Sequence, residues 1–212
     1  MARNKAIFDA DILIHLCKTS SIEKIVDCFE QIFISEYVYD IEIKDGTDEK
    51  QVIEKLINKG KIKVLYYKNL TDSQKKIYNE AYTTLKDQTY VGVINEGERR
   101  TACFANAHKV YYYMSDDNKA APHIRTLTFI EVINFCDLLF IALMINRNDI
   151  KELRYIYDKY ILLYDEDKIP KILRKNDETI KNFQETMAYC KTKFDSSEKL
   201  DKYLQLFIKD SN

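Results

Sequence analysis

The chain has 212 residues, of which 46% are hydrophobic, so it is long and apolar enough to bury the core of a globular domain of generous size. Its net charge of −1 excludes a strongly basic surface for tight binding to a polyanion, so any contact with nucleic acid must come from local patches. Its five cysteines form no CxxC pair, which disfavours a zinc finger.

The cysteines and the apolar stretches of the sequence predict the cellular location of the protein. An odd number of cysteines and the lack of a signal peptide predict a reducing, cytoplasmic location. The most apolar stretch, 135–145, is too short to span a bilayer and is expected to be a core helix. We therefore expect no membrane partner.

The predicted elements alternate between strands and helices as far as residue 163. Short apolar or alternating runs predict strands, and amphipathic runs with polar caps predict helices. Strands are expected at 5–9, 31–34, 61–67, 109–114 and 123–126, and helices from 12, from 20, and at 35–43, 47–58, 71–86, 95–108, 117–122, 127–146 and 149–163. This alternation predicts an α/β fold, a three-layer sandwich in which helices cover both faces of a central, mostly parallel sheet.

The character of the chain changes at residue 164. The polar run 165–168 and Pro170 interrupt regular structure, and two helical segments are predicted at 170–191 and 196–208. We therefore expect a main domain at 1–163 and a helical C-terminal extension at 164–212.

Acidic residues stand where strand-like runs give way to helix-like runs. Asp9 closes the first strand, Asp40 follows the second, Glu98 opens a helix, and Asp116 closes the strand 109–114. The carboxyl ends of parallel strands lie on one edge of a sheet, so these side chains are expected to converge there. Four converging carboxylates repel one another unless a cation lies between them, which predicts a site for a hard divalent metal.

Each of these acids also has a structural interpretation. Asp11 is suited to cap the first helix, Asn95 and Glu98 match a capping box, and paired acids after a strand suit an Asx-turn followed by a helix cap. Glu42 competes with Asp40 for the fourth acidic position, because residues two apart on a helix face different ways. His15 and His108 fit packed or surface roles better than a ligand role.

The order of three motifs resembles the PIN-domain family of metal-dependent ribonucleases. The motifs are a DxD-like start at Asp9, Gly97-Glu98 opening a helix, and Ser115-Asp116-Asp117 after a strand, and the similarity spans roughly 5–160. The resemblance implies a hydrolase that cleaves RNA with Mg²⁺ or Mn²⁺, often as the toxin of a toxin–antitoxin pair. RNA, an antitoxin protein and a second copy of the chain are the partners that it implies.

The resemblance also implies roles for particular residues. Carried over by position, Asp9, Glu98 and Asp116 are the catalytic metal ligands, Asp40 takes the fourth acidic position, and Asp117 assists through a water. Basic side chains near these acids are expected to hold substrate phosphates, with solvated helix faces as their alternative: Arg99, Arg100, Lys119 and Arg125.

Two other functions remain open from the sequence. The first is a catalytically inactive PIN-like binding or scaffold module that uses its helical tail, and it predicts no stabilisation by Mn²⁺. The second is a phosphatase or another α/β metal hydrolase, which predicts a closed pocket and turnover of small phosphate esters.

Overall fold

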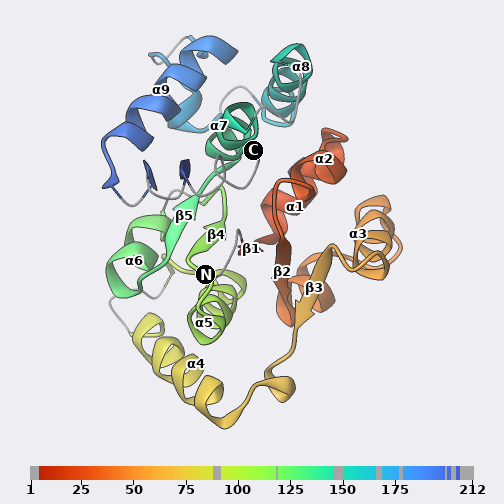
Figure 1. Ribbon diagram of the computed structural model, residues 1–212, viewed down its shortest axis with the longest axis vertical. Helices are drawn as coiled ribbons and strands as arrows, with labels where there is room; N and C mark the ends of the chain where they lie inside the picture. Colours follow the sequence, from red (N-terminus) through yellow and green to blue (C-terminus); the bar gives the residue numbers. More distant parts are fainter. Residues whose placement is uncertain are drawn as a thin grey trace.

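Five parallel strands form one central sheet in the order β3-β2-β1-β4-β5 (Figure 1). The computed structural model describes residues 5–87, 92–117, 119–145, 150–165, 169–176, 179–198, 200–201 and 204–205. The strands are β1 (Lys5–Phe8), β2 (Gln31–Ser35), β3 (Ile62–Leu65), β4 (Tyr112–Met114) and β5 (Glu131–Ile133). The predicted α/β class with a parallel central sheet is confirmed.

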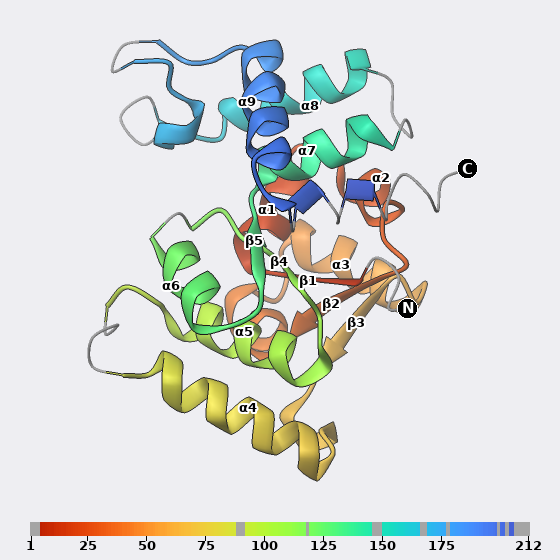
Figure 2. The same cartoon turned by 60° about the vertical axis from the view of Figure 1, so that its left-hand side comes forward.

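Both faces of this sheet are buried under helices. Along β1, Ala6 and Phe8 pack into one hydrophobic cluster and Ile7 into another, because successive side chains of a strand point to opposite faces. Figure 2 shows the strands between α4 and α5 on one side and α7, α8 and α9 on the other. The apolar strands therefore form the middle of three layers, as expected for a parallel sheet.

The two helical layers differ in size. The helices of the smaller layer are α4 (Asp72–Leu85), α5 (Glu96–His108) and α6 (Ala120–Leu127). Those of the larger layer are α1 (Ala10–Lys18), α2 (Ile22–Val26), α3 (Asp48–Asn58), α7 (Phe135–Met144), α8 (Ile150–Ile161) and α9 (Phe183–Asp195). Three single turns complete the described elements: η1 (Val38–Glu42), η2 (Tyr67–Asn69) and η5 (Lys171–Leu173). No helix in the described part of the chain is long and apolar enough to cross a membrane.

The region around residues 120–146 differs from the expectation. The predicted edge strand at 123–126 is wrong, because these residues belong to α6. The edge strand next to β4 is β5. The predicted helix at 127–146 is too long, since α7 begins only at Phe135. Asn134 ends the strand and caps α7 by accepting from the Asp137 backbone N–H at 2.9 Å. Hydrophobicity alone does not separate a buried strand from the helix that follows it.

A smaller difference concerns the second helix. The helix expected from residue 20 begins at Ile22, because Ser20 takes a left-handed conformation and Ser21 is the N-cap residue, without a side-chain hydrogen bond. The helical segment expected at 35–43 is present at 36–42, and its last five residues form the π-helical turn η1. Such turns occur often at functional sites.

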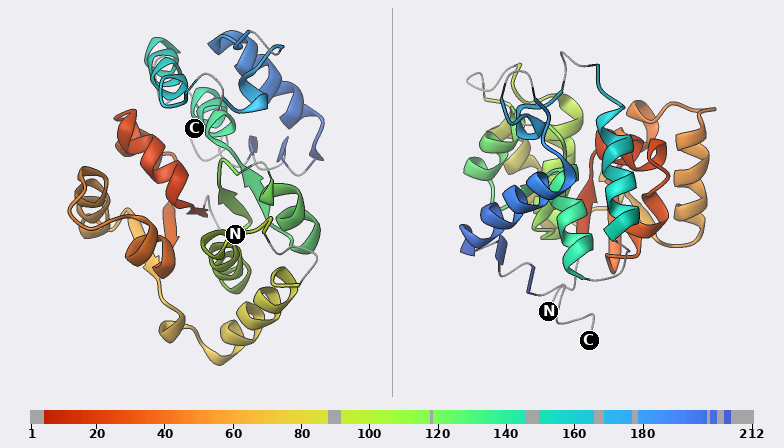
Figure 3. Two further views of the ribbon diagram at one scale, coloured as in Figure 1. Left: turned by 180° about the vertical axis from the view of Figure 1, so that it is seen from behind. Right: turned by 90° about the horizontal axis from the view of Figure 1, so that it is seen from above.

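The C-terminal extension packs into the larger layer (Figure 3). Phe183, Cys190 and Phe194 of α9 belong to the same hydrophobic cluster as Phe8 of β1. The fully buried Asp137 of α7 forms an ion pair with Lys193 of α9. Cutting the extension away would therefore expose part of the core and leave a buried charge without its partner.

Lys109 ends α5 in a left-handed conformation with φ of 55°. This conformation is strained for a residue with a side chain but not for glycine. We expect Lys109→Gly to raise the free energy of unfolding by about 0.5–1 kcal/mol. Urea unfolding measures the change. Lys109→Ala serves as the control, because a gain of the same size there would mean that loss of the lysine charge, not relief of strain, is the cause.

Candidate functional site

Asp9 lies at the carboxyl end of the central strand β1, beside the end of β4. Its backbone N–H donates to Met114 O at 2.9 Å, which continues the pairing of the two strands. Its carboxylate accepts from the Tyr113 hydroxyl at 2.8 Å and from Ser115 Oγ at 3.3 Å, and the residue is only 5% exposed. β1 and β4 are neighbours in the sheet, and this pairing places Asp9 at the acidic edge.

Glu98 lies in the first turn of α5, where the capping box is confirmed. Its Oε2 accepts from the Asn95 backbone N–H at 2.8 Å, and Asn95 Oδ1 accepts from the Glu98 N–H at the same distance. Asp117 lies close enough to Glu98 for its charge to raise the pKa of the Glu98 carboxyl group, after the larger effect of burial. Glu98 therefore serves both as the N3 residue of the capping box and as a member of the acidic cluster, so the two interpretations of this residue are compatible.

Glu42, and not Asp40, provides the acidic side chain from the segment after β2. Asp40 is exposed, and its charge acts on Tyr39 and Tyr66, away from the other acids. Glu42 feels the charges of Asp9 and Asp11 and packs against the Cα of Gly97 so closely that a Cβ there would overlap its carboxylate. The expected position of Asp40 in the cluster is therefore wrong, because η1 turns residues 40 and 42 in different directions.

Burial and mutual repulsion raise the pKa of each carboxyl group in this cluster. Burial is the main cause in each case; it raises the pKa of Asp9 to about 6, with a further contribution from the charge of Asp11. It raises the pKa of Glu42 to about 7 and that of Glu98 to about 8, and neighbouring acids add to both. The pKa of Asp11 is raised as well, by burial and by the charges of Asp116 and Asp117. The ionised cluster is therefore unstable by itself at neutral pH.

One atom of the cluster lacks any compensation. Glu42 Oε2 is buried and has no hydrogen-bond partner among the described residues. A buried carboxylate oxygen without a partner is costly, so it marks a place where a proton or a cation belongs.

Asp116 and Asp117 face different environments. Asp117 lies by Glu98, while Asp116 Oδ1 accepts from the Phe135 backbone N–H at 2.8 Å. Asp116 Oδ2 accepts from Tyr160 at 2.9 Å and lies 2.8 Å from His15 Nδ1. Asp116 is therefore engaged by α1, α7 and α8, and Asp117 takes the place in the cluster that was expected for Asp116.

The contact between His15 and Asp116 was not expected from the sequence. His15 is packed edge-on against Phe135 and Tyr160, which agrees with a packed role, but its ring also links α1 to the carboxyl end of β4. The only signal in the sequence is its position four residues after Asp11, on the same side of α1.

The basic residues expected to hold phosphates are mostly engaged elsewhere. Glu96 pairs with both Arg99 and Arg100, at 2.7 and 2.5 Å. Lys119 is exposed, and within the described part of the chain its side chain has no ion pair. Arg125, the fourth of these residues, lies 3.6 Å from Glu131, so among the described ion pairs Lys119 is the one of the four without an acidic partner.

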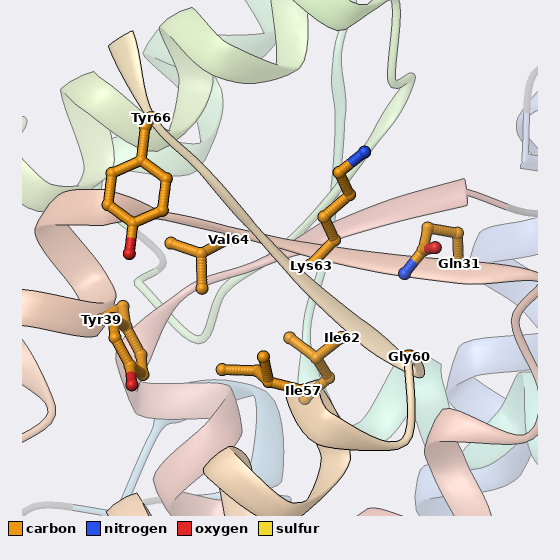
Figure 4. Close-up of a pocket in the computed structure, with 8 residues that line it drawn as sticks. All are labelled: Gln31, Tyr39, Ile57, Gly60, Ile62, Lys63, Val64 and Tyr66. Carbon is orange, nitrogen blue, oxygen red and sulfur yellow. The ribbon is translucent and has the colours of Figure 1, made fainter. Parts of the chain in front are cut away.

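A cavity of about 500 Å³ lies apart from the acids, along the edge strand β3. Figure 4 shows Tyr39 and Tyr66 at one end of it and Gln31 and Gly60 at the other. None of the described residues that line it is acidic. The cavity therefore lacks the carboxylates that a hard divalent ion prefers, and the acidic edge is the better candidate for a metal site.

The acidic cluster provides the donor atoms that Mg²⁺ or Mn²⁺ prefers, since all of them are carboxylate oxygens. Among the described residues, however, no group of three or more Asp, Glu, His or Cys side chains is arranged to hold a metal ion. The carboxylate oxygens suit such an ion chemically. In the present arrangement, however, bound protons and not an ion offset the repulsion between the carboxyl groups.

Comparisons of the chain with protein-family profiles, with curated proteins and with solved structures give no match. The functional argument therefore depends on the site itself.

Proposed function

We propose that the protein is a metal-dependent endoribonuclease whose divalent ion is bound by Asp9, Glu42, Glu98 and Asp117. The observation that carries this proposal is the convergence of carboxyl groups at the carboxyl edge of the sheet, where Glu42 Oε2 is buried without a partner among the described residues. Burial raises the pKa values of Asp9, Glu42 and Glu98 to about 6, 7 and 8, which agrees with this crowding. Perturbed acids gathered at one edge of a parallel sheet are typical of functional sites. A divalent cation would replace the protons and satisfy Glu42 Oε2, the buried oxygen without a partner.

Each acid has a distinct part in this proposal. Asp9 is held in place by Tyr113 and Ser115, so it provides the fixed ligand. Glu98 keeps its cap bond to Asn95 through one oxygen and turns the other toward the cluster. Glu42 approaches over Gly97, where only a glycine leaves room. An ion bound there would activate a water and neutralise the charge that develops on the phosphodiester.

The PIN-like identity is part of the same proposal. It is supported by the neighbourhood of β1 and β4, which brings Asp9 next to Ser115, and by Gly97-Glu98 at the start of α5. It carries with it Mg²⁺ or Mn²⁺ as the ion, RNA as the substrate, and a role as a toxin with an antitoxin and a second copy as partners.

One observation favours the second candidate, an inactive binding module. Asp116, which the family resemblance makes a ligand, is engaged by the Phe135 N–H, Tyr160 and His15. These contacts give Asp116 a structural role that needs no metal. In this case the protein would neither bind Mn²⁺ nor cleave RNA.

Glu42 and Asp40 offer a matched pair for testing the proposal. Both belong to η1, but only Glu42 faces the cluster. We expect Glu42→Gln to slow Mn²⁺-dependent cleavage of single-stranded RNA by about 10-fold or more, since it removes one ligand. Asp40→Asn should cleave like the wild type. Equal rates for the two variants, or no cleavage by the wild type, would contradict the proposal.

A further inference from the structure

A second cavity lies beside the acidic edge, between α6, the start of α7 and the C-terminal extension. It has a volume of about 160 Å³. Its polar lining consists of Ser115, Arg125, Asn134, Tyr189 and Lys193. None of the described residues that line it is acidic, in contrast to the cluster next to it.

The lining offers mainly hydrogen-bond donors. Asn134 is only 9% exposed, and its Oδ1 already accepts from Asp137 N, which leaves its amide N–H₂ group without a partner among the described residues. Arg125 Nη2 donates to Val132 O at 2.5 Å, and Arg125 Nε lies 3.6 Å from Glu131 Oε2. These contacts leave the N–H groups of Nη1 to donate to a ligand. A pocket rich in donors and poor in acceptors selects an anion.

The two basic side chains of the cavity, Lys193 and Arg125, are held in place by neighbouring residues. Lys193 pairs with the buried Asp137, and an ammonium group has two further N–H groups to offer. Arg125 is fixed by Val132 and Glu131. Side chains whose positions are fixed in this way lose little conformational entropy when a ligand binds.

Ser115 connects this cavity to the acidic cluster. It lines the cavity, donates to Asp9 at 3.3 Å, and accepts from the Asp117 backbone N–H at 3.2 Å. A ligand in the cavity is therefore separated from the carboxylates by a single residue. A cavity of 150 Å³ accommodates a ligand as small as benzene, so the available volume suits one phosphate group.

We propose that this cavity binds a phosphate group of the RNA strand next to the bond that is cleaved. The inference rests on the proposed nuclease function for the identity of the strand, and it gives the C-terminal extension a role in the site. Lys193 and Tyr189 of α9 supply one wall of the pocket, and Arg125 and Asn134 supply the other. The shared chemistry is a phosphate, either internal to the strand or at its 5′ end.

The test measures binding in EDTA, so that it does not depend on cleavage. The ligands are a single-stranded RNA with hydroxyl ends, the same RNA with a 5′-phosphate, and inorganic phosphate, each titrated at several salt concentrations. The variants are Arg125→Met, Tyr189→Phe and the double variant Asp137→Asn/Lys193→Met, which leaves no unpaired buried charge. Lys191→Met is the control, because Lys191 is on the same helix and its side chain is 63% exposed, outside the cavity.

We expect Arg125→Met and the double variant to weaken RNA binding about 5- to 10-fold and to reduce the slope of log K against log salt by about 0.7. Tyr189→Phe should weaken it less, and Lys191→Met should bind like the wild type. A loss confined to the 5′-phosphorylated strand identifies a terminal phosphate, and an equal loss for both strands identifies an internal one. Weaker binding of inorganic phosphate by the variants supports the pocket in either case.

Binding by the pocket variants that equals the wild type, or an equal loss in Lys191→Met, would overturn the inference. So would a wild type that binds none of the three ligands. Cleavage assays with Mn²⁺ separate the two proposals. If the protein binds phosphate in this cavity but cleaves no RNA, the nuclease function alone is refuted. If it cleaves RNA and the pocket variants bind RNA and phosphate as tightly as the wild type, the phosphate pocket alone is refuted.

Discussion

Glu98→Gln is expected to stabilise the folded protein at pH 8 by on the order of 2–4 kcal/mol and to change its stability little at pH 5. Burial, and then the charges of Asp117 and Asp9, raise the pKa of Glu98 to about 8 from the ordinary value of 4.5. Between these two values the folded state keeps a proton that the unfolded chain releases, so stability falls as the pH rises. Glutamine removes this loss, and its carbonyl oxygen retains the cap bond from Asn95 N.

Urea unfolding at pH 5 and pH 8 measures this effect. Glu96→Gln is the control on the same helix. Burial acts to raise the pKa of Glu96, but hydrogen bonds from Arg100 and Tyr82 outweigh it and lower the pKa overall. Glu96→Gln should therefore destabilise at pH 8 and not stabilise. If Glu98→Gln destabilises at both pH values, Glu98 is a helix cap and not part of a strained acidic site.

Asp9→Asn is expected to slow Mn²⁺-dependent cleavage of RNA by on the order of 100-fold or more. Asp9 lies at the centre of the cluster, because its charge contributes to the raised pKa of both Glu42 and Glu98. Asparagine keeps the size of the side chain and can still accept from Tyr113. The fold should therefore persist, and the loss should appear in the rate of cleavage at saturating RNA.

Ser115→Ala provides a graded comparison for Asp9→Asn. Ser115 donates to Asp9 at 3.3 Å without being a proposed ligand, so its loss should slow cleavage by about 10-fold. Circular dichroism and unfolding curves should show that both variants are folded. If Asp9→Asn retains the wild-type rate, the cleavage takes place at another site or comes from a contaminant.

The parallel sheet and the position of Asp9 could be predicted from the sequence because both depend on local patterns. Lys5–Phe8 is a short apolar run, and the residue that follows such a strand must lie at its carboxyl edge. The Asn95 and Glu98 pair was recognisable for the same reason, since a capping box spans only three residues.

The choice between neighbouring acids could not be predicted, because it depends on contacts between distant segments. The Asp116 carboxylate is held by His15, Phe135 and Tyr160, which lie far from it in the sequence. Glu42 replaces Asp40 because η1 winds as a π-helical turn and Gly97 leaves room for its carboxylate. A shift of one or two residues along the chain therefore decides which acid faces the cluster.

Titration of the metal-free protein with Mn²⁺ by calorimetry at pH 6.5, in two buffers of different ionisation enthalpy, tests the central claim most directly. At this pH the Glu42 and Glu98 carboxyl groups, with pKa values of about 7 and 8, are largely protonated. Binding of the ion to the cluster should therefore release about two protons per protein, and Glu98→Gln should weaken binding and release fewer. Absence of Mn²⁺ binding, or binding without proton release, would contradict the claim that a cation replaces protons among these carboxylates.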